Sequence, residues 1–159
     1  MNFNFLYESM LNESTSFTNW VKPKDSVIAR EYKVEYELKR LGDYYGNPFP
    51  TSADFVSAVK KAKVVAIDRA TDRTVGYRSG VSRSREEMVR MLKGYRSWPE
   101  FRNDSTVDAL YAGFGNNSPM EMPIILKQGN NMRIFSGNTR IDVAFQMGLP
   151  NYKAIVVEF

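Results

Sequence analysis

Residues 123–159, PIILKQGNNMRIFSGNTRIDVAFQMGLPNYKAIVVEF, decide the fold of this chain of 159 residues. Two apolar runs flank Gln128–Asn131, and its Gly-Asn pair is typical of a hairpin turn. A second glycine, Gly137, separates the return strand from apolar residues at helical spacing. The segment therefore predicts two strands, a helix and a last strand, over residues 123–126, 132–135, 139–147 and 152–159. This order is an α+β unit.

The residues before this unit predict mainly helices. A helix capped by Asp25 or Ser26 is expected to run to about Leu41, and a second helix starts at Thr51 or Ser52. Residues 1–24 form an arm with a short helix near Phe5–Leu11. We therefore expect an N-terminal helical extension over residues 1–61 and an α+β core over residues 62–159.

Within the core, Val64–Ile67 is an apolar, β-branched run that predicts a buried strand. The polar segment Asp68–Val81 predicts a loop. Ser84 to Glu87 has the spacing of a capping box, so a helix is expected there. A further short helix is expected from Asp104 or Ser105 to Gly113.

Composition excludes several classes of enzyme. The chain has no cysteine and no histidine. It therefore lacks thiolate nucleophiles, the side chains that most often bind zinc, and the usual general base near neutral pH. Serine-triad enzymes, cysteine proteases and zinc hydrolases are excluded. An enzyme would have to use carboxylate, amine or hydroxyl side chains, with an oxygen-ligated metal such as magnesium.

Hydropathy argues against a membrane protein. No apolar run approaches the roughly 18 residues that a membrane-spanning helix needs. Residues Met1–Leu6 do not resemble a signal peptide, which has a cationic start and a long apolar block. We expect a cytoplasmic protein with no membrane partner.

Positive charge is concentrated in residues 60–96. They hold 11 basic and 4 acidic side chains, whereas the whole chain has a net charge of +4. Such a surplus attracts the phosphates of nucleotides or nucleic acids, and nearby Tyr77 and Tyr95 offer stacking surfaces. The alternative is a solvated face in which the arginines lie along a connection between strand and helix. The residues expected to contact nucleic acid are Arg69, Arg73, Arg83 and Arg85.

The turn over residues 135–140, Phe-Ser-Gly-Asn-Thr-Arg, is the candidate phosphate-binding site. Amides at the start of a helix have no intrahelical acceptor, and the helix dipole is positive there, so an anion is a natural ligand. The glycine permits a close approach, and the arginine adds a fixed charge. We expect phosphate contacts from Ser136, Gly137, Asn138, Thr139 and Arg140.

A structural interpretation of the same turn is equally physical. One of the polar side chains at 136, 138 and 139 would cap the helix. Arg140 would then pair with Asp142 or Glu158. The residue types alone leave both interpretations open.

From Ser118 onward the order of motifs resembles the ParB/sulfiredoxin-like fold. Members share a proline before a hydrophobic strand, a hairpin, a G-x-x-R turn that opens a helix, and a final strand after a Gly-Leu-x segment. The matching segments here are Met122–Ile125, Ser136–Arg140 and Gly148–Pro150. The resemblance covers residues 62–159. Residues 1–60 have no counterpart, and the connector 94–117 is longer than in chromosome-partitioning members.

The resemblance implies site residues one by one. Sulfiredoxins carry a catalytic cysteine and a histidine after the glycine turn, where this chain has Asn138 and Thr139, so sulfinic-acid reduction is excluded. In ParB proteins the turn contributes to binding of a cytidine nucleotide, and here Gly137 and Arg140 fit that pattern. Arg78 resembles the family arginine that faces the phosphates.

The resemblance gives candidates for catalytic residues only by their location in the chain. Relatives that phosphorylate free serine use carboxylates to activate a hydroxyl, and the candidates here are Asp68, Asp72 and Glu86. Family members are often labelled nucleases, but no D-x-D or E-x-K pattern stands out. A nucleotide with magnesium would be the cofactor of such an enzyme.

Three functions follow as hypotheses. The first is a nucleotide- or DNA-phosphate-binding protein that acts in DNA metabolism. The second is a magnesium-dependent phosphoryl-transfer or nuclease-type enzyme of the same fold. The third is a phage-encoded protein that inhibits a host factor through residues 1–60 in the bacterial cytoplasm. A phage origin is favoured by the Asn/Ser-rich start and by an unusual extension on a reduced core.

Overall fold

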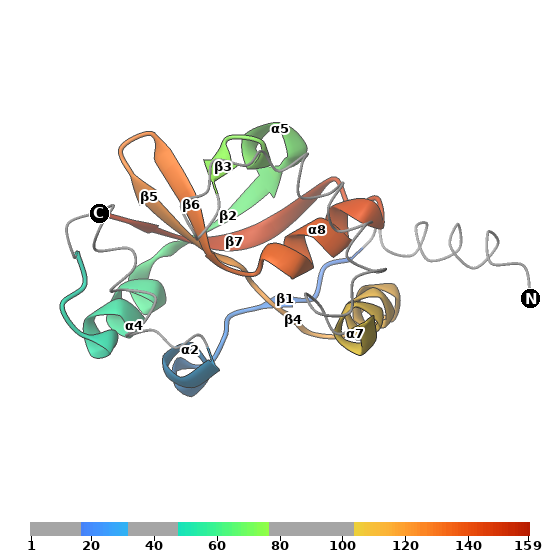
Figure 1. The fold of residues 1–159 in the computed structure, drawn as a ribbon, viewed down its shortest axis with the longest axis horizontal. Coiled ribbons are helices and arrows are strands. Elements are labelled where there is room, and N and C mark those ends of the chain that lie inside the picture. The colour runs from blue at the N-terminus through green and yellow to red at the C-terminus, as the bar shows by residue number, and fades with distance from the viewer. Residues whose placement is uncertain (1–16, 32–47, 77–103) are drawn as a thin grey trace, which may run out of the picture.

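The computed structural model describes residues 17–31, 48–76 and 104–159. In these residues the chain is a mixed α+β structure, with helices on both sides of a twisted sheet (Figure 1). This confirms the expected fold class. The helices are α2 (Asp25–Glu31), α4 (Ser52–Lys61), α5 (Arg69–Asp72), α7 (Asp104–Gly115) and α8 (Asn138–Gln146). The strands are β1 (Trp20–Val21), β2 (Lys63–Asp68), β3 (Val75–Gly76), β4 (Met120–Glu121), β5 (Ile124–Gln128), β6 (Asn131–Ser136) and β7 (Asn151–Glu158).

Some expectations lie outside the described residues. They include the short helix near Phe5–Leu11, the continuation of α2 toward Leu41 and the helix after Ser84. The same holds for these candidate site residues: Tyr77, Arg78, Arg83, Arg85, Glu86 and Tyr95.

The main sheet has five strands in the order β2-β7-β5-β6-β3. β5 and β6 form the expected antiparallel hairpin, and its turn contains Gly129 at φ 59°. β7 lies parallel to β5 and antiparallel to β2, while β3 lies parallel to β6. The last strand of the chain is therefore the second strand of the sheet, and α8 is the crossover that takes the chain from β6 to β7.

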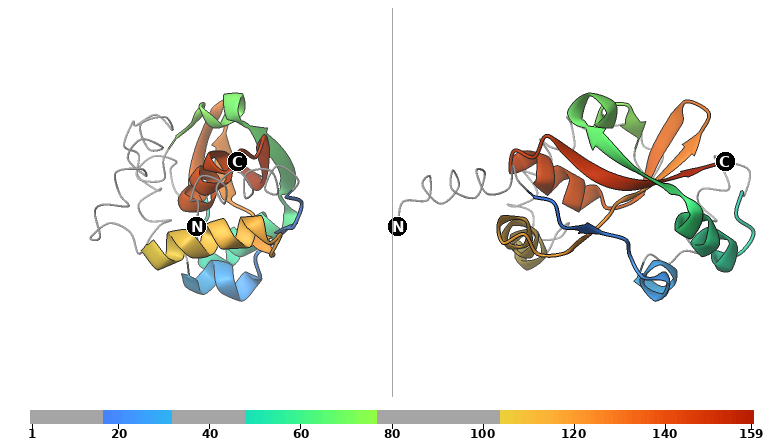
Figure 2. Two further views of the ribbon diagram at one scale, coloured as in Figure 1. Left: turned by 90° about the vertical axis from the view of Figure 1, so that its right-hand side faces the viewer. Right: turned by 180° about the vertical axis from the view of Figure 1, so that it is seen from behind.

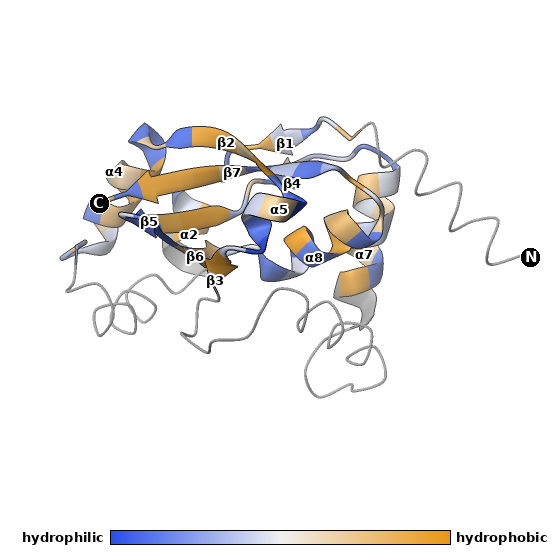
Figure 3. Ribbon diagram, turned by 90° about the horizontal axis from the view of Figure 1, so that it is seen from above, coloured by the Kyte–Doolittle hydropathy of each residue, from blue (hydrophilic) through white to orange (hydrophobic). Residues whose placement is uncertain are grey.

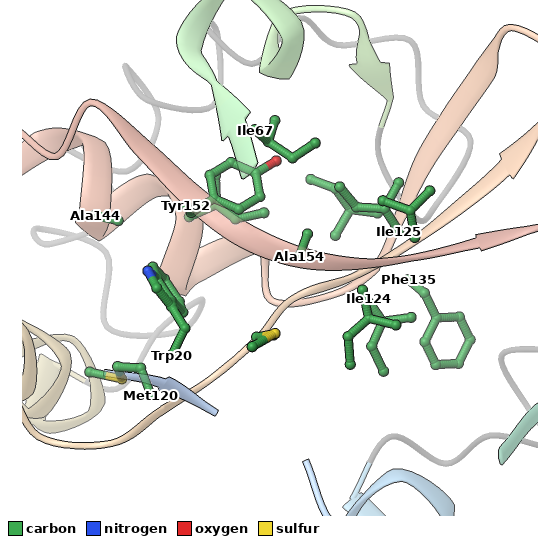
Figure 4. Close-up of a cluster of buried hydrophobic side chains, with 14 of the residues drawn as sticks. Trp20, Ile67, Met120, Ile124, Ile125, Phe135, Ala144, Tyr152 and Ala154 are labelled. Carbon is green, nitrogen blue, oxygen red and sulfur yellow. The ribbon is translucent and has the colours of Figure 1, made fainter. Parts of the chain in front are cut away.

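Side chains pack on both faces of the sheet. Figure 4 shows Tyr152 and Ile67 on one side of β7, with Ile124 and Phe135 on the other. All four side chains are at most 2% exposed. Burying an aromatic or branched aliphatic side chain contributes about 1.5–3 kcal/mol relative to exposure, so these layers dominate the stability of the fold.

Helix α4 begins where the sequence predicts. Thr51 and Asp54 form a capping box, in which the Thr51 hydroxyl accepts from the Asp54 amide and the Asp54 carboxylate accepts from the Thr51 amide. One face of the helix is buried through Phe55 and Val59. The Phe55 ring lies 4.5 Å from that of Phe135, centroid to centroid. The helix is therefore packed directly on β6.

The N-terminal residues that the structure describes share the core of the sheet. Phe17, Trp20 and Phe114 pack edge to face, with ring centroids 4.9 to 5.5 Å apart. β1 pairs in parallel with β4, and the two run side by side below the sheet (Figure 2). Neither of these two-residue strands was predicted, because two residues are too few to show the alternation of apolar and polar side chains that marks a strand.

Strand β2 is present, but the prediction that Val64–Ile67 is buried is wrong. Val64 and Val65 are 40% and 38% exposed, and only Ile67 in this strand is buried. The reason is topological, since β2 is an edge strand that pairs only with β7 among the described strands. Figure 3 shows the apolar colour of β2 beside that of β7 and β5.

The prediction of a loop from Asp68 to Val81 is also wrong for residues 68–76, the part that the structure describes. The chain there forms α5 and then β3, which pairs with β6 through Val75 and Met132. Of the described helices, none combines the length and the apolar character needed to cross a membrane.

Candidate functional site

Gly137 is the corner between β6 and α8. Its φ of 104° and ψ of 14° lie in a left-handed region where L-residues with a side chain are strained. A Cβ at this position would also lie 2.8 Å from Pro123 Cβ and 3.0 Å from Pro123 Cα. The close approach that the glycine permits is therefore made by Pro123. Glycine is required here on both counts.

The N-terminus of α8 has the properties of an anion site. Gly137 is the N-cap residue and has no side chain with which to cap the helix, and the first turn of α8 contains no acidic residue. The first i to i−4 bond runs from the Ile141 amide to the Gly137 carbonyl, at 3.0 Å. The amides before Ile141 have no intrahelical acceptor by helix geometry, and the dipole is positive at this end. The N-cap is Gly137, and the Ser136 hydroxyl makes no hydrogen bond, so Ser136 does not cap the helix.

Ser136 ends β6 directly before this corner. It is 3% exposed, and its hydroxyl is buried with no hydrogen-bond partner. A buried polar group without a partner costs about 1–3 kcal/mol, and such groups are few in folded proteins. The hydroxyl is therefore an unsatisfied donor and acceptor at the N-terminal end of α8.

Arg140 is held by Glu121 of β4. Its Nη1 donates a hydrogen bond to the Glu121 carbonyl at 2.5 Å and lies 3.9 Å from Glu121 Oε2. The Arg140 side chain is only 14% exposed. The expected structural partners were Asp142 and Glu158. Glu158 instead pairs with Lys127 at 3.4 Å, at the other end of the hairpin from the glycine corner.

Sequence reasoning missed Glu121, although the hairpin contained a signal. The register pairs Ile124 with Ser136, so the residues before β5 lie opposite those after β6. This places Pro123 beside Gly137 and brings Glu121 within reach of Arg140. Continuing the predicted hairpin by one residue would have placed Pro123 beside Gly137, but α8 begins at Asn138, so the pairing does not extend to Glu121.

Asp68 acts as the N-cap of α5. Its carboxylate accepts a hydrogen bond from the Thr71 amide at 2.8 Å. Hydrogen bonds from the Thr71 backbone and side chain lower the pKa of Asp68 from its ordinary value, because they stabilise the charged form. The residue explains where α5 begins.

Asp72 lies inside the fold. It is 4% exposed, and its Oδ1 accepts a hydrogen bond from the Tyr152 hydroxyl at 2.7 Å. Tyr152 belongs to β7 and is fully buried. The contact joins the end of α5 to the sheet.

Arg69 lies against the C-terminal end of α8. Its Nη2 donates a hydrogen bond to the Phe145 carbonyl at 2.5 Å, and its guanidinium carbon lies 5.3 Å from the centre of the Phe145 ring. A cation that bonds a terminal carbonyl stabilises the C-terminus of a helix. Arg73, the other described arginine of this segment, is exposed and forms the C-cap of α5.

The structure therefore separates the predicted residues into two groups at opposite ends of α8. The phosphate candidates lie at its N-terminus. Arg69 instead contacts Phe145, which is seven residues after Asn138, the first residue of α8, and therefore about 10 Å farther along the helix axis. Asp68 and Asp72 flank or belong to α5, on the side of Arg69. No group of three or more acidic residues that could hold a metal ion occurs in the described part of the chain.

No protein-family model, curated protein or solved structure matches this chain. The candidate functions therefore rest on its own residues and their geometry. Of the two ends of α8, the N-terminal end has a glycine N-cap and the buried Ser136 hydroxyl, which makes no hydrogen bond. At the C-terminal end the Phe145 carbonyl and the Asp72 carboxylate have protein partners, and Gln146 Oε1 accepts from the Tyr111 hydroxyl, while the buried Gln146 Nε2 makes no hydrogen bond.

Proposed function

We propose that the chain binds a phosphate group of a nucleotide or nucleic acid at the N-terminus of α8. The observation that carries this proposal is the helix start, where Gly137 offers no side-chain cap and the first turn holds no carboxylate. Helix N-termini of this kind bind anions through their amides and dipole. A role in DNA metabolism would follow from that ligand class.

Two side chains support a phosphate as the ligand. Arg140, in the first turn of α8, brings a guanidinium to the helix end, and guanidinium groups form paired hydrogen bonds with phosphate oxygens. Ser136 brings a buried hydroxyl that has no partner.

We also propose that the sheet and α8 form a ParB/sulfiredoxin-like core. Support comes from the order of elements, in which a hairpin, a glycine corner, a helix and a last strand follow one another. The glycine corner opens the helix as the G-x-x-R motif of that fold implies. This resemblance is also the reason to expect that the bound phosphate belongs to a nucleotide.

The enzyme hypothesis has no comparable support. Asp68 caps α5 and Asp72 bonds Tyr152, so both described carboxylates have structural partners. The interaction hypothesis concerns residues 1–60, of which Phe17, Trp20, Ile28, Phe49, Phe55 and Val59 pack in the core. Phosphate binding at α8 is therefore the function we retain.

The experiment compares two arginine variants that lose the same charge. Arg140→Gln removes the proposed ligand, and Arg133→Gln removes a charge from β6, toward the hairpin turn. Calorimetric titrations with the four nucleoside triphosphates and with short single- and double-stranded DNA distinguish a nucleotide from a nucleic acid. Each is run with and without magnesium.

We expect saturable binding by the wild-type chain that weakens as salt is raised. Arg140→Gln should lose about 10- to 100-fold in affinity, because a charge-assisted hydrogen bond contributes about 1.5–3 kcal/mol. Arg133→Gln should bind nearly as the wild type does. Absence of binding for every ligand, or equal losses in the two variants, contradicts the proposal. Magnesium-dependent product formation would support the enzyme hypothesis instead.

A further inference from the structure

Glu121 contacts Arg140 through its main chain and through its side chain. Arg140 Nη1 bonds the Glu121 main-chain carbonyl at 2.5 Å, and the same atom lies 3.9 Å from Glu121 Oε2. The second distance is too long for a hydrogen bond, so the carboxylate acts on the guanidinium through its charge. The backbone of Glu121 therefore positions Arg140, and its side chain neutralises it.

We infer that the Glu121 carboxylate competes with phosphate for Arg140 and so keeps the anion site at the start of α8 self-inhibited. This inference rests on the proposed function and adds regulation to the same site. A phosphate at the helix start has to share Arg140 with a negative charge that is already beside it. Binding is therefore strengthened by anything that removes or turns away that carboxylate.

The main chain of Glu121 is held on both sides. The Met120 amide donates to the Asn19 carbonyl at 2.9 Å, and the Met122 amide donates to the Val21 carbonyl at 2.8 Å. β1 thus fixes the carbonyl that receives Arg140. Only side-chain rotation can relieve the competition, and Glu121, at 36% exposed, has more freedom to rotate than Arg140, at 14%.

Ser136 gives a second and independent indication of a ligand at this end of α8. Its hydroxyl is buried without a partner, whereas buried hydroxyl groups normally have one. A phosphate oxygen at the adjoining helix start is an acceptor of the kind that it lacks.

The test compares Glu121→Gln with Glu158→Gln. Both substitutions remove one negative charge and keep the shape of the side chain, but Glu158 pairs with Lys127 instead of Arg140. The main-chain carbonyl that holds Arg140 remains in both proteins. The probes are inorganic phosphate and a single-stranded DNA oligonucleotide of mixed sequence, titrated by calorimetry at constant salt. Thermal unfolding of each variant confirms that it is folded.

We expect Glu121→Gln to bind about 1.5- to 5-fold more tightly than Glu158→Gln, the range given by ion pairs that are partly exposed. The gain should disappear when Arg140→Gln is added to Glu121→Gln.

Two results overturn it. If the wild type binds and the two glutamate variants bind equally, the competition is refuted and the proposed function stands. If neither the wild type nor Glu121→Gln binds either probe, both the competition and the proposed function are refuted.

Discussion

Pro123 lies directly against the α-carbon of Gly137. A Cβ added at 137 would be 2.8 Å from Pro123 Cβ, a distance that side chains do not tolerate. The contact follows from the hairpin. Its register pairs Ile124 with Ser136, so Pro123, just before Ile124, lies beside Gly137, just after Ser136. The corner that opens α8 is thus fixed by packing as well as by its backbone angles.

Gly137→Ala should therefore destabilise the fold strongly. The left-handed backbone costs about 1–3 kcal/mol for a residue with a side chain, and the clash with Pro123 adds a further about 1–3 kcal/mol. Gly129→Ala is the matched control, because Gly129 has a φ of 59° but nothing within 4 Å of an added Cβ. Chemical denaturation of both variants measures the difference. Equal losses would show that Pro123 does not constrain the corner.

Ser136→Ala separates ligand binding from stability. Removing a buried hydroxyl that has no partner should leave the free energy of unfolding unchanged or raise it by about 1 kcal/mol. The same variant should bind phosphate ligands about 2- to 10-fold more weakly, since a neutral hydrogen bond contributes about 0.5–1.5 kcal/mol. Denaturation and calorimetry give the two quantities. Exposed Ser57→Ala is the control and should change neither. A Ser136→Ala protein that is less stable but binds normally contradicts the proposed ligand contact.

The segment from residue 123 to the end was predictable because its signals are local. Glycines mark the hairpin turn and the corner before α8, and apolar residues at helical spacing mark α8 itself. The start of α4 was predictable for the same reason, since Thr51 and Asp54 cap it over three residues. Each of these features is decided by neighbours in sequence.

Features decided by distant contacts were not predictable. The exposure of Val64 depends on the position of β2 at the sheet edge, which an apolar run does not reveal. One partner of Arg140 is the Glu121 carbonyl, and a main-chain acceptor has no residue type to recognise.

Asp68 should make stability depend on pH in the acid range. Its pKa is lowered in the folded chain by the hydrogen bonds from Thr71, so its contribution is present above the unfolded value of about 3.9 and is lost as pH falls through the folded value. Asp68→Asn keeps a capping side chain but removes this titration. Denaturation across the acid range should show a shallower loss of stability for Asp68→Asn than for the wild type. Identical slopes would mean that the cap contributes no pH dependence.

Arg69→Ala tests whether this arginine stabilises α8 or binds nucleic acid. Loss of its hydrogen bond to the Phe145 carbonyl and of its contact with the Phe145 ring should lower the free energy of unfolding by about 0.5–2 kcal/mol. Arg73→Ala removes an exposed arginine at the C-cap of α5 and should change the free energy of unfolding by no more than about 0.5 kcal/mol. Phosphate affinity should be nearly the same in both variants, because α8 separates Arg69 from Arg140. An Arg69→Ala protein of normal stability that loses DNA affinity would instead place the nucleic-acid contact at the C-terminal end of α8.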